Sequence, residues 1–178
     1  KILADFGRRH PLPRIIRNEP NRGAIASIRL GLELATANYI YFAASDDYIL
    51  PGFIEKQMAE LTKHPQVGLC CSFRSTLIAA TGEILEYATG WCDKPRYFTP
   101  EELVPMVGRE VLPGHAHSIV KRTDFEAAGG ILSELRWYSD WFTCFVIAFR
   151  TGICHVPEML TVFRLSPQSF GGSGARSA

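Results

Sequence analysis

The run Tyr39-Ile40-Tyr41-Phe42-Ala43 constrains the fold of this sequence more than any other segment. Its aromatic and β-branched residues favour a strand, and it lies between two stretches in which apolar residues have helical spacing. The first stretch covers about 24–37, and the second begins near Phe53 and stops at His64-Pro65. We therefore expect 39–43 to form a central strand of an α/β domain, with one helix before it and one after it.

An antiparallel unit interrupts this alternation in the middle of the chain. Residues 67–73 predict a strand, and 76–80 and 84–88 flank the turn Thr81-Gly82-Glu83 as the arms of a hairpin. The sheet is therefore expected to be mixed, with helices flanking it.

The last strong helical pattern begins at Ser139 or Asp140 and ends at Gly152. Its largest apolar residues predict the buried face, which would consist of Phe142, Phe145, Val146 and Phe149. Two short strands, at 153–156 and 160–164, are expected to follow. The Gly- and Ser-rich segment 169–178 predicts a flexible tail.

Three shorter signals predict local structure. Residues 14–17 (RIIR) indicate a short strand. Thr99-Pro100-Glu101-Glu102 is a capping box with proline at the first helical position, so a short helix should begin there. The sequence Thr123-Asp124-Phe125-Glu126 has the same pattern and predicts another helix start.

Charge and cysteine content exclude several classes of protein. Nineteen basic and eighteen acidic residues leave a net charge of +1, which is too balanced for a nucleic-acid-binding surface. The longest apolar run, around Phe145–Phe149, is far shorter than the roughly 20 residues that span a bilayer. The five cysteines include no C-x-x-C pair, and the adjacent Cys70 and Cys71 should point to opposite faces of a strand. We expect reduced thiols and a cytoplasmic protein.

Asp46 and Asp47 are the first candidates for chemistry, because they follow directly on the predicted central strand. In open α/β sheets, ligands bind at the carboxyl ends of the strands. Carboxylate oxygens suit Mg²⁺ or Mn²⁺, with water and substrate phosphate completing the coordination. The alternative is that these residues only cap the helix that begins after Pro51.

Other candidates lie in the second half of the chain. Asp140, in Trp137-Tyr138-Ser139-Asp140-Trp141, is an acid among aromatic residues and could serve as a base, or it could cap the following helix. His115 and His117 could bind metal or phosphate if their segment is extended, or could be ordinary loop residues. Arg164 could close over a diphosphate. No G-x-G-x-x-G pattern supports a dinucleotide site.

The order of these features along the chain is more informative than any one of them. The first half contains, in sequence, Asn21, Gly23, Gly31-Leu32, Ala35, Tyr39-Ile40, Ser45-Asp46-Asp47 and Pro51. The second half contains Arg122, Phe125, Gly129-Gly130, Leu135, Ser139-Asp140-Trp141, Gly152, Val156-Pro157-Glu158, Leu160 and Arg164. In order and spacing they resemble the family 2 glycosyltransferases, over about residues 14–170.

The resemblance implies the GT-A fold and an inverting, non-processive transfer of a sugar from a nucleotide-sugar to an acceptor hydroxyl. Mn²⁺ or Mg²⁺ would bridge the donor diphosphate. By position, Asp46 matches the metal-binding carboxylate, Asp47 its supporting neighbour and metal partner, and Asp140 the base. The resemblance further assigns donor contacts to Asn21, Gly23, Asp47 and Arg164, and acceptor contacts to His115, Tyr138 and Trp141.

The sequence departs from the family pattern at several positions. Ala44 replaces the first aspartate that the family often has, Ser27-Ile28-Arg29 replaces Ala-Arg-Asn, and Ser139 replaces a glutamate before the base. No Gln-x-x-Arg-Trp follows Asp140, which argues against a processive polymer synthase. These departures motivate an alternative function as an inactive relative that binds a sugar nucleotide or a glycan. A nucleotidyltransferase is a third hypothesis, but the sequence shows no glycine-, lysine- and arginine-rich signature loop to support it.

The family normally begins with a βαβ unit that holds the nucleobase. Residues 1–13 resemble only the tail of the next helix, so we expect one amino-terminally incomplete catalytic domain over 1–168. An open sheet edge would permit oligomerisation. The family implies bacterial polysaccharide or glycoconjugate synthesis, with a saccharide or lipid-linked acceptor, peripheral membrane association and no nucleic acid partner.

Overall fold

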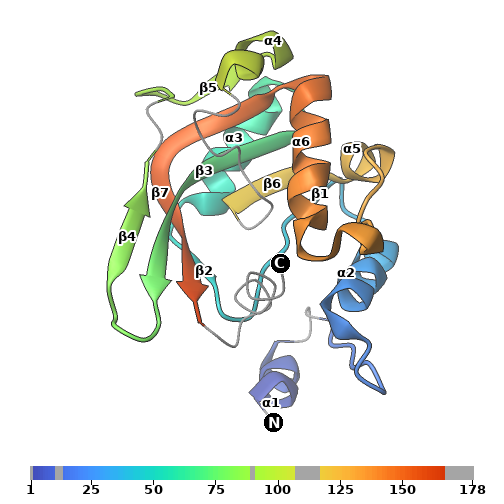
Figure 1. The fold of residues 1–178 in the computed structure, drawn as a ribbon. Coiled ribbons are helices and arrows are strands. Elements are labelled where there is room, and N and C mark those ends of the chain that lie inside the picture. Colours follow the sequence, from blue (N-terminus) through green and yellow to red (C-terminus); the bar gives the residue numbers. More distant parts are fainter. Residues whose placement is uncertain (1, 11–13, 89–90, 107–116, 167–178) are drawn as a thin grey trace.

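The computed structural model describes residues 2–10, 14–88, 91–106 and 117–166. Within them, a seven-stranded mixed sheet has the order β1-β6-β3-β7-β2, with β4 beside β3 and β5 beside β7 (Figure 1). The strands are β1 (Tyr39–Ile40), β2 (Tyr48–Ile49), β3 (Leu69–Ile78), β4 (Ile84–Tyr87), β5 (Arg96–Phe98), β6 (Ser118–Lys121) and β7 (Ile153–Leu165). The helices are α1 (Ile2–Arg9), α2 (Gly23–Leu34), α3 (Phe53–Lys63), α4 (Pro100–Leu103), α5 (Arg122–Ala127) and α6 (Ser139–Thr151), with 3₁₀ turns η1 (Val104–Met106) and η3 (Ser133–Tyr138).

The parallel pair β3–β7 forms the middle of this sheet. Each of the two strands is continuous where the sequence predicted two shorter strands. The break in the apolar pattern that suggested two strands corresponds to a bulge within one strand. The register moves from Ser72↔Val156 to Phe73↔Met159 and then to Arg74↔Thr161. The added residues of β7 include Pro157, which has no N–H to donate to a ladder and is tolerated at a bulge.

The bulge also anchors the loop that precedes α3. The backbone N–H of Leu50 donates to the carbonyl of Leu160, with N and O 2.8 Å apart. Lys56 of α3 forms an ion pair with Glu158. The bulge thus fixes the position of the segment between β1 and α3, which carries the acidic pair.

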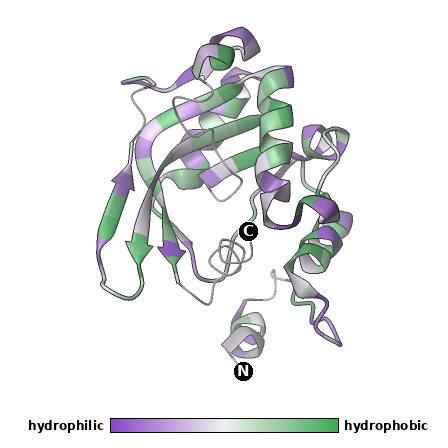
Figure 2. Ribbon diagram, in the orientation of Figure 1, coloured by the Kyte–Doolittle hydropathy of each residue, from purple (hydrophilic) through white to green (hydrophobic). Residues whose placement is uncertain are grey.

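Two hydrophobic clusters cover the two faces of the sheet. On one face α6 packs against β3, β6 and β7, and on the other α3 does so (Figure 1). Cys71 belongs to the first cluster and Cys70 to the second, which confirms that their side chains point to opposite faces. All five cysteines are free thiols. Figure 2 shows the hydrophobic residues gathered where α6 crosses β3 and β6.

The buried face of α6 differs from the expected one. Phe142 and Phe149 are exposed, and Phe145 and Val146 are only half-buried. The buried residues of α6 are Ser139, Thr143, Cys144, Ile147 and Ala148. The reason is close approach of helix and sheet, because a Cβ on Gly68 would lie 2.4 Å from Cγ2 of Ile147. Only compact side chains fit between the two elements, so the aromatic rings lie outside.

Other sequence predictions were wrong in detail. The expected central strand is an edge strand in the described sheet, and only Tyr39 and Ile40 of it pair, with β6. Residues 14–17 form no strand; Ile15 and Ile16 are exposed, and no described strand pairs with them. A segment without a neighbouring strand gains no ladder hydrogen bonds, so its β-propensity has no effect.

The two expected helix starts have different outcomes. The capping box at Thr99 is confirmed, since the Thr99 hydroxyl accepts from the Glu102 N–H and the Glu102 carboxylate accepts from the Thr99 N–H. At α5, however, the N-cap is Lys121 and makes no side-chain cap. Thr123 therefore lies inside the helix, because β6 runs directly into α5.

No described helix is long and hydrophobic enough to cross a membrane.

His155 of β7 is a buried histidine at the centre of an aromatic group. Its ring packs against Phe73 and Trp91, at centroid distances of 4.8 and 5.3 Å, and its Nδ1 lies 3.4 Å from Sγ of Cys92. Burial lowers the pKa of His155 from the usual 6.5 to about 4. The imidazole is therefore neutral at physiological pH, and it joins the segment around Trp91 to the sheet.

This burial predicts a pH dependence of stability. As pH falls from 6.5 towards 4, the unfolded chain binds a proton at His155 and the folded chain does not. We expect this group to leave the free energy of unfolding unchanged above pH 6.5 and to lower it below, by about 3 kcal/mol near pH 4. Urea titrations across this range should show the slope, and His155→Phe should reduce it. Cys92→Ala, which keeps the imidazole, should retain it; an unchanged slope in His155→Phe would contradict the assignment.

Gly152 ends α6 at a point where no side chain fits. Its φ is +75°, and a Cβ there would lie 2.2 Å from the carbonyl oxygen of Phe98 and 2.5 Å from Cε2 of Tyr97. Gly152→Ala should therefore lower the free energy of unfolding by about 2 kcal/mol or more, measured by urea denaturation. Gly31 in α2 has nothing within 4 Å of the same position, so Gly31→Ala is the matched control and should raise stability by up to about 1 kcal/mol.

Candidate active site

Asp46 and Asp47 lie in the turn between β1 and β2, at the lower edge of the sheet in Figure 1. Both are partly buried. The N-cap of α3 is Gly52, with φ of +89° and no side-chain cap. Neither aspartate caps the helix, so the capping alternative is excluded. The Asp47 carboxylate is held instead by a hydrogen bond to the sheet.

Asp47 connects this turn to the end of β7. Its Oδ1 accepts a hydrogen bond from the backbone N–H of Arg164, with N and O 2.8 Å apart. Beside this bond, Tyr48 pairs with Val162 in antiparallel register. The sequence named Asp47 and Arg164 as partners in one site, and the structure brings them together, through the main chain of Arg164.

Two further polar side chains interact with Asp47. Burial raises the pKa of Tyr41, and the Asp47 charge raises it further. Burial lowers the pKa of Arg74, while Tyr87 and Asp47 act in the opposite direction. A half-buried cation thus compensates the acidic turn.

Arg74 was missed by the sequence analysis. It lies in β3 with its guanidinium carbon 4.6 Å from the ring centre of Tyr87 and 5.9 Å from that of Phe163. Its Nη1 donates to Oγ1 of Thr76 at 3.2 Å. The available signal was a lone arginine inside a strand of mostly apolar and small residues.

Asp140 lies in the first turn of α6 and is partly buried. The N-cap is Tyr138, which makes no side-chain cap, so Asp140 is not the capping residue. Its charge adds to the burial that raises the pKa of Cys144. In Figure 1 the first turn of α6 is the lower end of that helix, drawn in front of the sheet, and β7 ends further down at the left.

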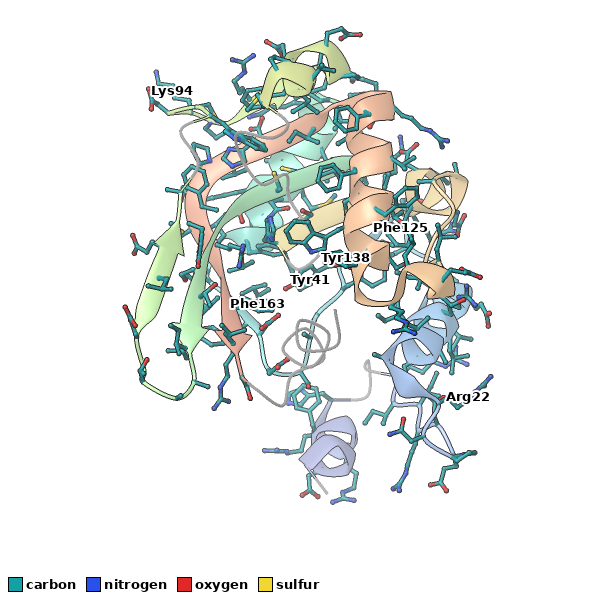
Figure 3. The ribbon with its side chains drawn as sticks, in the orientation of Figure 1. Arg22, Tyr41, Lys94, Phe125, Tyr138 and Phe163 are labelled. Carbon is teal, nitrogen blue, oxygen red and sulfur yellow. The ribbon has the colours of Figure 1, made fainter. Side chains whose placement is uncertain are left out.

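The expected acceptor residues are only partly described. Tyr138 is 52% exposed, and Figure 3 labels it near Tyr41 in the middle of the view. Trp141 is partly buried, with its ring 6.5 Å from that of Phe145. The backbone carbonyl of His117 accepts from Nε2 of Gln57 at 3.2 Å. His115, the side chain of Trp137 and the tail 169–178 lie outside the described residues.

Comparison with known proteins identifies the family. The family model described as glycosyl transferase family 2 matches residues 1–122. This chain belongs to glycosyl transferase family 2. No curated protein gives a significant match. The predicted GT-A-type fold, a mixed sheet flanked by helices, is likewise confirmed by solved structures.

These structures are of TarS from S. aureus. TarS 1–349 in complex with UDP-GlcNAc has a TM-score of 0.72 at 15% identity, covering 97% of this chain and 48% of that one. TarS 1–349 alone has a TM-score of 0.67 at 15% identity, covering 92% and 47%. A further TarS structure has a TM-score of 0.64 at 14% identity, covering 94% and 29%. The chain thus spans about half the length, or less, of the structures it matches.

In this family 2 chain, Asn21 and Gly23 form a turn before α2. The Gly23 N–H donates to Oδ1 of Asn21 at 2.9 Å, and Gly23 has φ of +82°. Arg29, one of the departures from the family pattern, donates to the carbonyl of Ile131 at 2.8 and 3.1 Å. These contacts order α2 and attach it to the segment before η3.

Ser139 also has a structural role where the family has glutamate. It is buried, and its hydroxyl accepts from the N–H of Leu132 at 2.6 Å. This bond closes the η3 turn that leads into Asp140. The same turn contains Arg136, a non-glycine residue with φ of +50° and ψ of −124°. The approach to Asp140 is thus held in a strained conformation.

The acidic turn carries oxygen donors of the kind that hard divalent cations prefer. Among the described residues, no group of three His, Cys, Asp or Glu side chains could hold a metal alone. A Mg²⁺ or Mn²⁺ ion that binds together with a diphosphate needs only one or two carboxylates. Asp46 and Asp47 supply such oxygen donors on one turn, and Arg164 N–H fixes the Asp47 carboxylate.

The strain at Arg136 predicts a measurable effect. Arg136→Gly should remove the steric cost and raise the free energy of unfolding by about 1 kcal/mol, as measured by urea denaturation. Glu134→Gly, in the same turn, has no positive φ to relieve and should lower stability. If both variants lower it equally, Arg136 is not strained.

Proposed function

We propose that this chain is the catalytic part of an enzyme that transfers a sugar from a nucleotide-sugar to an acceptor hydroxyl. The observation that carries the proposal is the arrangement of carboxylates in a family 2 fold. The acidic turn is tied to the end of β7, and Asp140 lies in the first turn of α6. The N-cap residues of α3 and α6 are Gly52 and Tyr138, not these acids.

A uridine diphosphate sugar is the proposed donor class. The TarS structure that aligns with 97% of this chain is a complex with UDP-GlcNAc, which makes this compound the first donor to test. The acceptor is proposed to be a saccharide or lipid-linked hydroxyl of a bacterial surface glycan. Tyr138 and Trp141 supply aromatic surface for it beside Asp140.

Asp140 is proposed to act as the base. It would accept the proton of the acceptor hydroxyl while that oxygen attacks the anomeric carbon, and the bond to the nucleoside diphosphate would break on the opposite face. Such a single displacement inverts the anomeric configuration.

Asp46 and Asp47 are proposed to hold Mn²⁺ or Mg²⁺ together with the donor diphosphate. The ion would neutralise charge on the departing diphosphate. The turn itself contributes rigidity, because the bond from Arg164 N–H to Asp47 holds the Asp47 carboxylate before any ligand binds. In the described sheet β1 is an edge strand, which is compatible with a partner, and we propose cytoplasmic action at the membrane surface.

The base is tested by Asp140→Asn in the intact protein. This variant should release UDP from UDP-GlcNAc, with Mn²⁺ present, about 10²–10⁴ times more slowly, because the general base is lost. Donor affinity, measured by calorimetry, should change little. Glu134→Gln is the matched control, since Glu134 is an exposed acid close by in η3, and it should keep the wild-type rate.

The result separates the two functions that the sequence allows. Donor binding without turnover on any acceptor would favour the alternative of an inactive sugar-nucleotide-binding relative. Equal loss of rate in Asp140→Asn and Glu134→Gln would also overturn the proposal. Asp46→Asn should weaken Mn²⁺ binding measured in the presence of UDP, while Glu134→Gln should not.

A further inference from the structure

Arg74 has few of the contacts that would explain a half-buried arginine in the middle of a sheet. Removing a guanidinium from water is unfavourable unless its N–H groups find acceptors. Within the described residues, its hydrogen-bond acceptor is Oγ1 of Thr76. Arg122, by contrast, donates to the carbonyl of Ala37 and to the carboxylate of Glu126. Arg74 therefore keeps donor capacity that structural contacts do not use.

The neighbours of Arg74 hold its guanidinium in one place. Tyr87 is its direct register partner in β4, and Phe163 of β7 lies on its other side. With ring centres at 4.6 and 5.9 Å from the guanidinium carbon, both contacts are within cation–π range. A side chain already ordered in this way loses little conformational entropy when a ligand binds.

The surroundings of Arg74 place this cation beside the acidic turn. The Asp47 charge acts on Arg74, and Asp47 is fixed to the N–H of Arg164, directly after Phe163. A guanidinium offers paired N–H donors that match the oxygens of a phosphate. A phosphate bound by Arg74 would therefore lie within the electrostatic influence of Asp47.

We propose that Arg74 binds a phosphate group of a substrate, with its guanidinium held by Tyr87 and Phe163 and its charge balanced by Asp47 in the absence of ligand. The proposal rests on the proposed function, which supplies a phosphorylated substrate. The phosphate belongs either to the donor diphosphate or to a phosphorylated acceptor, and the chemistry of recognition is the same.

The test measures binding, without turnover, in the intact protein. Inorganic pyrophosphate with Mn²⁺ represents the donor, and glycerol phosphate represents a phosphorylated acceptor. Arg74→Gln should weaken binding of one of these probes roughly 10–100-fold, the effect of losing a charge-assisted hydrogen bond. Arg74→Lys should give a smaller loss, since it keeps the charge without the planar fork. The affected probe identifies which substrate carries the phosphate.

The matched control is Arg96→Gln. Arg96 also lies over an aromatic ring, 4.2 Å from the centre of Phe98, but it pairs with Glu102 near the start of α4. This variant should bind both probes as the wild type does. Tyr87→Leu, which keeps Arg74 and removes one ring, should weaken binding several-fold and serves if Arg74→Gln does not fold.

The proposal is overturned if Arg74→Gln, folded by circular dichroism, binds both probes with wild-type affinity, or if Arg96→Gln weakens binding equally. Failure of the proposed function has a different signature. Asp140→Asn should bind pyrophosphate normally whether or not Asp140 is the base, so a turnover result for Asp140 leaves the Arg74 result unaffected.

Discussion

The parallel pair β3–β7 is the constraint on which the rest of the structure depends. Its first half carries the packed faces of the sheet, where α6 and α3 bury Cys71 and Cys70. Its second half, beyond the bulge at Pro157, carries Arg74 and the strand end that holds Asp47. The same pair of strands thus contributes to the hydrophobic core at one end and to the polar edge at the other, and its pairing register changes at the bulge between them.

The polar edge is organised by charge compensation. Partly buried carboxylates are unfavourable without a cation nearby, and the charge of Arg74 in β3 acts on Asp47 to offset this cost. The bond from Arg164 N–H to Asp47 then fixes the turn without using the Arg164 side chain. Asp140 belongs to a separate element, α6, whose first turn is shaped by the buried hydroxyl of Ser139.

The sequence predicted the features that local pattern controls. The helices at 53–63 and 139–151, the Thr99 capping box and the mixed sheet all follow from spacing and caps. The sequence did not predict the features that depend on contacts between residues far apart in the chain. The close approach at Gly68 reverses the buried face of α6, and the position of β1 at the sheet edge depends on strand partners that periodicity does not specify. Arg74 escaped notice for the same reason, since its neighbours come from β4, β7 and the turn before β2.

The cysteines differ in how far the fold protects them from chemical modification. Cys70, Cys71, Cys144 and Cys154 are buried, and burial raises their pKa values, so they are protected from thiolate-directed reagents in the folded state. Cys92, beside His155, is partly accessible. The rate of Cys92 alkylation would report local unfolding of the segment around Trp91. The other four cysteines would be alkylated only when the sheet unfolds.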